Sequence, residues 1–548
     1  MKNDFIGINE LFKRTMKYIF QFAVALFLMS IILGIFLQSC KKKTSFNEDG
    51  KLTVVLKYSG NNAAELQKAI DHYSIDVKDS LKLKAACFLI ENMIGKGSVH
   101  YNELENGNLC SYDLFKSNIG VDSICLLKKR YEDSVGGGKI VFADPSFKED
   151  VKMVTSAELI QNIEYAFKAW QFPWAKHLSF NQFKELILPY RVEQEPLQNW
   201  REYFFKHSNW IFNRIGNSTD RIKIAGVIND SLKKNYKYIH NAITFFPGSF
   251  TVKQLKAMGG GRCADLNMLA GYWLRAIGIP TAAEFTPYWS NSNTGGHSWL
   301  SILDTNGKFV PMNAIYDNPV RDSLPFKDAY LAKAFRSTYE ISTVHFEQQE
   351  YAHNFYDITA EYLPTIDYSM TTSFPISSTA YIGVLNGSFW KPLETETIQK
   401  GREITFKTIA RNVLYAPIII LDRNKTVTIG RPFFVYKSGK VHSFVENKNK
   451  LTDISIDVSS LINNVYGKKC QVVYWDDQLK NWIPTGEPKY LTDDPKVTVL
   501  KKAKTYVIFK NVISGAIYRI IDSNSIPNGI SYGRPFIYVE DVNGYIDY

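Results

Sequence analysis

The chain has 548 residues, of which 45% are hydrophobic, 14% aromatic and 22% charged, a composition typical of folded protein. This composition excludes a disordered, collagen-like or coiled-coil protein. Lysine and arginine number 65 against 54 acidic residues, for a net charge of +11, but no basic block alternates with stacking aromatic residues. We therefore expect no nucleic-acid partner.

The N-terminus has the pattern of an export signal. Basic residues precede an uncharged apolar run over residues 19–37, and Ser39, Cys40 and three lysines follow it. This resembles a bacterial lipoprotein signal peptide, which is removed before a cysteine that then carries acyl chains. The run is also long enough for an uncleaved membrane span, which is the alternative. We expect residues 1–39 to be removed and Cys40 to anchor the protein in the cell envelope, facing the periplasm because no acidic surface-export stretch follows it.

Helical periodicity dominates the next part of the chain. Apolar residues recur at helical spacing over residues 62–93 and again over 155–212, whereas residues 99–150 are rich in turn formers. These patterns predict a helical N-terminal domain over residues 40–215 with a loop-rich excursion. The aromatic residues of this part favour packing roles, and no chemistry is visible in it.

The character changes between about residues 216 and 350. A helical pattern over 222–241 leads to three glycines at 259–261, after which a second helix opens at Cys263 and closes at Gly278. Strand patterns follow, with a hairpin predicted around the turn formed by residues 304–307. These residues predict an α+β core.

The C-terminal part has all-β character and an internal repeat. Phe406, Tyr415 and Arg431 recur as Phe509, Tyr518 and Arg534, each displaced by 103 residues. We expect two similar sandwich-like β units over residues 351–450 and 451–548, with the repeated residues at least half buried. Trp390 and Trp482, which also correspond, fit either a packed core or an exposed face that stacks sugars.

The cysteine pattern limits the kinds of site that these residues can form. Besides Cys40 there are five cysteines, and none forms a C-x-x-C pair, so no metal site and no cofactor are expected. Cys110 and Cys125 are the only near pair for a disulfide. Cys263 differs because it follows three glycines and begins a helix, whose positive end stabilises a thiolate. It is the predicted nucleophile, and its backbone amide is a candidate oxyanion donor.

A general base and an orienting residue follow in the hairpin. His297 lies 34 residues after Cys263 and begins the first strand of the hairpin. Pairing Leu303 with Lys308 would place His297 within diagonal reach of Asn313, which is therefore the predicted orienting residue. Asp317 is the competitor, because a carboxylate would bind imidazolium more strongly.

These residues carry a family resemblance. The stretch from residue 259 to 314 resembles the core of the transglutaminase-like superfamily, which has a Cys, His and Asp triad on a papain-like α+β fold. The resemblance implies that Cys263 is the nucleophile and His297 the base, with Asn313 at the third position where Asp is usual. The whole chain resembles the secreted transglutaminase-like lipoproteins of Bacteroidetes, and we place the core at residues 216–350.

The expected function is that of a cell-envelope lipoprotein with a thiol acyl-transfer site, and a peptide or protein, possibly glycosylated, is its expected substrate. Hydrolysis of an amide or peptide bond and transamidation both follow from the same acyl-enzyme, and they differ in whether water or an amine resolves it. The alternative is a non-catalytic lipoprotein that retains the fold and binds peptide or glycan.

Overall fold

The computed structural model describes residues 50–105, 108–109, 140–239, 248–290, 295–325, 331–341, 354–375, 379–386, 389–397, 402–422, 425–457, 469–490, 506–522, 531–539 and 544–547. The expected signal peptide lies outside these ranges, as do Cys40, Cys110 and Cys125. No helix within the described ranges is long and apolar enough to cross a bilayer.

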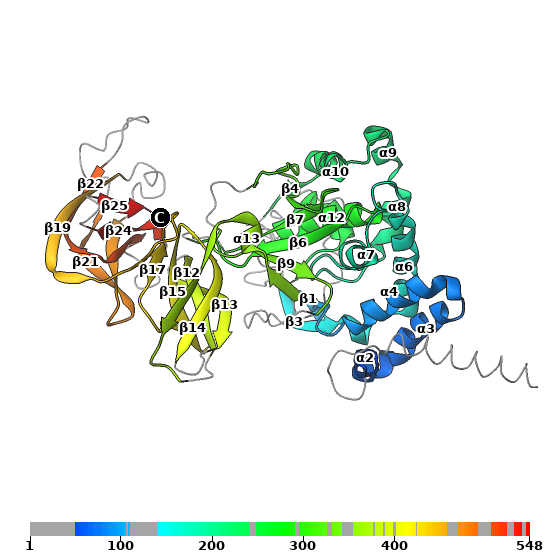
Figure 1. Cartoon of the computed structure of the whole chain (residues 1–548), viewed down its shortest axis with the longest axis horizontal. Helices are drawn as coiled ribbons and strands as arrows, with labels where there is room; N and C mark the ends of the chain where they lie inside the picture. Colours follow the sequence, from blue (N-terminus) through cyan, green and yellow to red (C-terminus); the bar gives the residue numbers. More distant parts are fainter. Residues whose placement is uncertain are drawn as a thin grey trace, which may run out of the picture.

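Helices account for most of the described residues between 51 and 276 (Figure 1). Several begin with a capping box, in which a Ser or Thr side chain and a Glu or Gln three residues later satisfy the first backbone N–H groups. The helices are α2 (Lys51–Ser59), α3 (Ala63–Ser74), α4 (Ser80–Glu91), α6 (Ser156–Trp170), α7 (Phe180–Leu186), α8 (Trp200–Lys206), α9 (Asn209–Ile215), α10 (Arg221–Asn235), α11 (Val252–Met258), α12 (Cys263–Ala276) and α13 (Thr359–Tyr362).

A five-stranded antiparallel sheet lies against these helices, with strand order β10-β9-β6-β7-β8. Its strands are β6 (Thr281–Thr286), β7 (His297–Leu303), β8 (Phe309–Met312), β9 (Phe335–Thr338) and β10 (Asn354–Asp357). Helix α12 packs on β6 and β7. The sheet extends past the expected boundary at residue 350, because β10 pairs with β9.

The helical region and the sheet share one hydrophobic core. Leu66 and Phe183 from the N-terminal helices belong to the same buried cluster as Leu269 of α12 and Leu300 of β7. Trp174 also donates an indole hydrogen bond to the carbonyl of Ile277 at 2.6 Å. Residue 215, where we expected a domain boundary, therefore does not separate two cores.

The segment expected to be loop-rich contains a three-stranded antiparallel sheet instead. Strand β1 (Gly97–Glu105) pairs with β2 (Asn108–Leu109) and with β3 (Ile140–Glu149). The register between β1 and β3 shifts at a bulge between His100 and Asn102. The glycines at 136–138 lie outside the described residues.

The predicted hairpin is present, but its register is displaced by one residue. Leu303 pairs with Phe309 rather than with Lys308. The Asp304 carboxylate accepts the N–H groups of Asn306 and Lys308, at 2.7 and 3.0 Å, which draws Lys308 into the turn. The turn is therefore one residue longer than the strand pattern suggested.

Beyond residue 364 the chain is rich in antiparallel strands, drawn in yellow to red in Figure 1. One group has the order β13-β12-β15-β17-β18 and a β11-β14 pair, and the other has β21-β20-β23-β24-β25 and a β19-β22 pair. The strands are β11 (Thr365–Thr371), β12 (Thr379–Asn386), β13 (Phe389–Thr397), β14 (Glu403–Ala410), β15 (Val413–Asp422), β16 (Lys425–Thr428), β17 (Phe433–Val435), β18 (Val441–Ser443), β19 (Asn447–Asp457), β20 (Lys469–Asp476), β21 (Asn481–Tyr490), β22 (Tyr506–Ser514), β23 (Ile517–Asp522), β24 (Ser531–Val539) and β25 (Gly544–Asp547).

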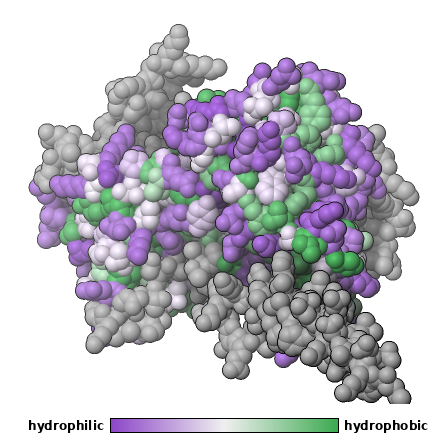
Figure 2. Space-filling view, turned by 45° about the vertical axis from the view of Figure 1, so that its right-hand side comes forward, coloured by the Kyte–Doolittle hydropathy of each residue, from purple (hydrophilic) through white to green (hydrophobic). Residues whose placement is uncertain are grey.

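The tryptophans of this region are buried rather than displayed. Trp390 is 3% exposed and Trp482 is 7% exposed, and both lie edge-on to Trp475 in one apolar cluster that joins the two strand groups. They do not form an exposed stacking face. The face of the molecule in Figure 2 is mostly hydrophilic, with hydrophobic residues in separate patches.

The expectation that Arg431 is half buried is wrong. Its side chain is 54% exposed and lies 3.8 Å from Asp477. Packing this guanidinium in the core would remove the water around its charge, so the charged end of the side chain stays at the surface. The corresponding Arg534 lies outside the residues whose side chains the structure describes.

Candidate active site

Three glycines bring the chain into Cys263 along a path that few other residues could follow. Gly259 ends α11 with a φ of 66°, in the left-handed region that favours glycine. Gly260 pairs with Lys237 in a short parallel bridge between β4 (Lys237–Tyr238) and β5 (Gly260–Gly261). A Cβ on Gly260 would lie 2.2 Å from the Lys237 carbonyl oxygen. The close backbone approach therefore fixes where α12 begins.

Cys263 is the first residue of α12. Asp265 stabilises this end of the helix: its carboxylate accepts the N–H of Arg262 at 3.0 Å and a guanidinium hydrogen bond from the same residue at 2.8 Å. Asp265 also accepts the N–H of Phe250 at 3.2 Å. The positive end of the helix and the partly buried thiol thus lie together, which favours the thiolate.

The ring of His297 lies beside this thiol. Burial of Cys263 raises the pKa of its thiol, but the hydrogen bond and positive charge of His297, together with hydrogen bonds from Ser298, lower that pKa to about 7. Burial of His297 lowers the pKa of its ring, whereas hydrogen bonds to Cys263 and Asn313 and the charge of the thiolate raise it, and the net direction is upward. Each group therefore favours the charged form of the other, as a thiolate and imidazolium pair requires.

Asn313 holds the other side of the ring. Its Oδ1 lies 3.0 Å from His297 Nε2, and its Nδ2 donates to Asp317 Oδ2 at 3.0 Å. A carboxylate only accepts hydrogen bonds, so it must face the amide nitrogen and leave the amide oxygen toward the ring. Nε2 then carries the proton, and Nδ1 faces Cys263. Of the two predicted orienting residues, Asn313 contacts the ring and Asp317 lies behind it.

The turn that carries Asn313 is held by Asn229, a fully buried residue of α10. Its Nδ2 donates to the backbone carbonyls of Asn313 and Asp317, at 3.3 and 3.2 Å, and its Oδ1 accepts the N–H of Ile315 at 2.7 Å. Ile315 has a φ of 65°, which is unusual for a β-branched residue. This turn, and not the pairing of β7 with β8, places the Asn313 side chain against His297.

A buried polar network lies beneath the histidine ring. Trp299, two residues along β7, has its ring centroid 6.1 Å from that of His297 and donates its indole N–H to Glu284 at 2.8 Å. Glu284 is fully buried and pairs with Arg336 at 2.6 Å. Trp289 stacks on His297 with a centroid distance of 5.8 Å. These contacts restrict the orientation of the ring.

A pocket of about 410 Å³ opens over these groups. Tyr238 and Tyr316, both exposed, meet edge to face at its mouth with their ring centroids 6.0 Å apart. Its lining residues are Tyr238, Cys263, Leu266, Asn267, His297, Ser298, Asn313, Ala314, Tyr316 and Asp317. The predicted nucleophile, the base and both candidate orienting residues therefore line one cavity.

Several residues of this site escaped the sequence analysis. Ser298, which follows His297 directly, could have been noticed by its position. Asn229 carried no signal, because it reaches the site from a distant segment. Among the described residues, no group of His, Cys, Asp and Glu is arranged to hold a metal ion.

Comparison with known proteins identifies the domain that contains these residues. Residues 192–314 match the family model of the transglutaminase-like superfamily, so the chain contains a transglutaminase-like domain. No curated protein matches the chain significantly. A structure of a candidate cysteine protease from Cytophaga hutchinsonii aligns with 34% of this chain at 15% identity and a TM-score of 0.20. The alignment spans 65% of that protein, just under two thirds of its length.

Proposed function

We propose that the transglutaminase-like domain catalyses thiol-mediated acyl transfer at an amide or peptide bond. The observation that carries this proposal is the hydrogen-bonded series Cys263, His297 and Asn313 at the start of α12. A lowered thiol pKa, a base within hydrogen-bond reach and a residue that orients the base are the requirements of a cysteine nucleophile.

In the proposed reaction Cys263 Sγ attacks the substrate carbonyl carbon as the thiolate. The imidazolium of His297 then protonates the leaving amine through Nδ1, and the C–N bond breaks to leave a thioester. Water or an acceptor amine, deprotonated by the neutral ring, attacks the thioester and releases Cys263. The Cys263 backbone N–H is the proposed first oxyanion donor.

Hydrolysis is the favoured outcome within this proposal. The pocket is bordered by the exposed side chains of Tyr238, Tyr316 and Asp317, so water can reach a thioester on Cys263 from this side. An acceptor amine would need to compete with that water. The proposed substrate is therefore a peptide or protein, and the proposed class is a cysteine peptidase or amidase, with transamidation as the second outcome.

We also propose that Cys40 is lipidated and anchors the protein in the cell envelope, facing the periplasm. The apolar run and the small residue before Cys40 support this. N-terminal mass spectrometry of the membrane fraction tests it: a diacylated or triacylated Cys40 peptide is expected. An intact Met1-containing protein in the membrane would contradict it and support the uncleaved span.

The two C-terminal strand groups are further proposed to be copies of one β unit. They share a strand order, and in each a tyrosine hydroxyl donates to the backbone carbonyl five residues upstream, from Tyr415 to Ala410 and from Tyr518 to Ile513. The two donors and the two acceptors are each 103 residues apart, which is the displacement of the sequence repeat. An experimental structure in which the two groups differ in topology would contradict this.

An activity probe tests the catalytic proposal. A chloroacetamide probe should label Cys263 in the full chain at neutral pH, and Cys263→Ala should abolish both that label and the cleavage of a peptide library. Labelling without any cleavage or transamidation would overturn the enzyme assignment and leave a binding lipoprotein with a retained fold.

A further inference from the structure

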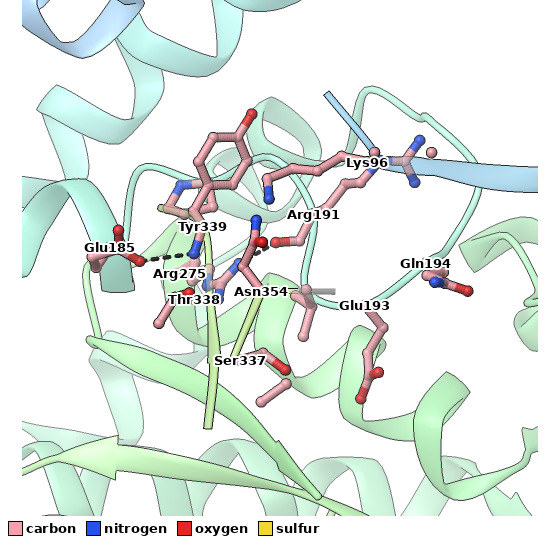
Figure 3. A pocket seen from close by; sticks show the side chains of 15 residues that line it. Lys96, Glu185, Arg191, Glu193, Gln194, Arg275, Ser337, Thr338, Tyr339 and Asn354 are labelled. Carbon is pink, nitrogen blue, oxygen red and sulfur yellow. Dashed lines mark hydrogen bonds between the residues drawn. The ribbon is translucent and has the colours of Figure 1, made fainter. Parts of the chain in front are cut away.

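A second cavity, of about 50 Å³, is separate from the pocket over Cys263, and the two have no described lining residue in common. It lies where the starts of β1 and β10 and the end of β9 meet the segment that follows α7 (Figure 3). Its lining includes the nitrogen-bearing side chains of Lys96, Arg191, Arg275 and Asn354. A single water molecule needs only about 10–15 Å³, so the cavity can hold a small polyatomic ion.

Lys96 has no direct anionic partner in this cavity. Its Nζ forms no hydrogen bond or ion pair with the residues that the structure describes, and it lies 4.6 Å from the ring centroid of Tyr339. Burial lowers the pKa of this ammonium to about 8, although the charges of Glu185 and Asp150 act in the opposite direction. A desolvated ammonium without a direct partner is costly, and a bound negative charge would offset that cost.

Asn354 and Arg191 add unpaired N–H groups to the same lining. Asn354 is 7% exposed and Arg191 is 6% exposed. Within the described part of the chain, neither Asn354 Nδ2 nor Arg191 Nη1 has a hydrogen-bond partner, although Arg191 Nε donates to Asp150 at 2.5 Å. Figure 3 shows the Asn354 amide and the Lys96 ammonium pointing into the space between Tyr339 and Arg191. Because buried N–H groups in folded proteins are almost always paired, these groups indicate a missing acceptor.

The carboxyl groups at the cavity wall do not supply that acceptor. The two oxygens of Glu185 accept the backbone N–H groups of Tyr339 and Glu340, at 2.8 and 3.0 Å. The carboxyl group of Glu193 is turned away from the Lys96 ammonium (Figure 3). Both carboxylates therefore leave the space beside Lys96 without a negative group.

Arg275 adds a buried positive charge to the wall. It is 4% exposed, and its guanidinium donates to the backbone carbonyls of Thr281 and Arg191. No described carboxylate forms an ion pair with it. The cavity is thus lined by two cations without a direct ion-pair partner, Lys96 and Arg275, and by two unpaired N–H groups.

A small oxyanion matches this set of groups. Ammonium, guanidinium and amide N–H groups donate to the oxygens of phosphate, sulfate and carboxylate groups, and the bonds are strong because the acceptor is charged. A metal cation would find few acceptors and would be repelled by Lys96 and Arg275. Water molecules could accept the same hydrogen bonds, but they would bring no charge to Lys96.

We propose that this cavity binds a small oxyanion, as phosphate, sulfate or a carboxylate group, between Lys96, Asn354 and Arg191. The bound ion would connect the starts of β1 and β10 with the segment after α7, which are distant from one another in the sequence. The inference goes beyond the proposed function and depends on neither Cys263 nor His297.

The experiment measures thermal unfolding and isothermal titration calorimetry of the full chain at pH 7. Sodium phosphate, sodium sulfate and sodium acetate are each compared with sodium chloride at equal ionic strength. An anion that binds the folded protein should raise the unfolding midpoint by about 2–4 °C at ten times its Kd. Titration should give saturable binding of one ion per chain.

Substitutions locate the binding. Lys96→Met keeps the length of the side chain without its charge and should weaken binding of the anion at least about tenfold. Asn354→Leu keeps a similar volume without the N–H group and should weaken it about tenfold. Lys148→Met is the matched control, because Lys148 is exposed on β3 and does not line the cavity. Without added anion, Lys96→Met should be at least as stable as the wild type, since it removes an unpaired buried charge.

The anion series also identifies the source of the oxyanion. Binding of phosphate or sulfate would support a free inorganic ion, and binding of acetate alone would support a carboxylate carried by a peptide or metabolite. Absence of saturable binding for all three anions would overturn the inference. Equal stabilisation of the wild type and Lys96→Met would also overturn it, because phosphate and sulfate stabilise folded proteins in general through exclusion from their surface.

Discussion

Asn313 and Asp317 form a hydrogen bond of 3.0 Å in which the amide nitrogen donates to the carboxylate, while the amide oxygen of Asn313 accepts from His297. Asp317 therefore does not contact the His297 ring directly but acts on it through the amide of Asn313. It fixes the orientation of that amide and polarises its oxygen toward the imidazole. This explains how an asparagine can stand where the superfamily usually has an aspartate.

Replacing Asn313 by Asp should therefore not improve the site. Two carboxylates would face each other at about the distance of the present hydrogen bond, and one of them would take up a proton. Asn313→Asp should lower Cys263 alkylation at pH 7 severalfold relative to the wild type. In Asn313→Asp/Asp317→Asn the donor and acceptor are exchanged, and this double variant should recover the rate. If the single variant were faster than the double variant, Asp317 would not be the partner of residue 313.

Cys263 should titrate near neutrality and depend on His297 to do so. With a thiol pKa of about 7, alkylation should rise as the pH passes through 7 and fall toward pH 5 as the thiolate is protonated. In His297→Ala the hydrogen bond and the positive charge are lost, so the pKa should rise and the rate at pH 7 should drop at least about tenfold. The pH profile of the labelled Cys263 peptide measures both. An unchanged midpoint in His297→Ala would show that the ring does not activate the thiol.

The two carboxylates that pair with Arg336 beneath the histidine should contribute unequally to stability. Glu284 is fully buried against Arg336, whereas Glu361, which bonds the same guanidinium at 2.7 Å, has a side chain that is 46% exposed. Glu284→Gln removes the one fully buried carboxylate from the guanidinium and leaves only the half-exposed Glu361 as its ion-pair partner among the described residues, so it should lower the free energy of unfolding by about 3–5 kcal/mol. Glu361→Gln is the matched control and should cost about 1 kcal/mol or less. Urea denaturation measures both, and equal effects would refute the distinction.

Gly260 should tolerate no side chain. A Cβ there would lie 2.2 Å from the carbonyl oxygen of Lys237, so Gly260→Ala must displace the backbone that leads into Cys263. We expect it to lower Cys263 alkylation at pH 7 more than about tenfold by moving the sulfur from His297. Gly295→Ala is the control, because a Cβ at Gly295, two residues before His297, would meet nothing within 4 Å. Similar losses in both variants would indicate a general loop effect.

Cys263→Ala should leave stability nearly unchanged. The thiol is partly exposed at the helix start and contributes little packing, so the free energy of unfolding should change by less than about 1 kcal/mol. Thermal or urea unfolding measures this alongside the loss of labelling. A large destabilisation would mean that Cys263 has a structural role, and loss of activity in the variant could not then be assigned to chemistry.

Part of this site could be predicted from local signals in the sequence. Glycines before a helical pattern identified Cys263 at a helix start, and a strand pattern placed His297 in a hairpin. Helical and strand periodicities likewise indicated helices before a mixed core and strands after it. Such signals are local because they reflect backbone preferences and the side of an element that faces the core.

How those parts meet depends on contacts that form only in the folded chain. The hairpin register moved by one residue because the Asp304 side chain captured backbone groups of the turn, a competition that strand periodicity does not reveal. Asn229 closes the turn that carries Asn313 from 84 residues away. The common hydrophobic core of the N-terminal helices and the sheet is equally non-local. Contacts between residues distant in the chain depend on packing, and a single sequence gives no local pattern for them.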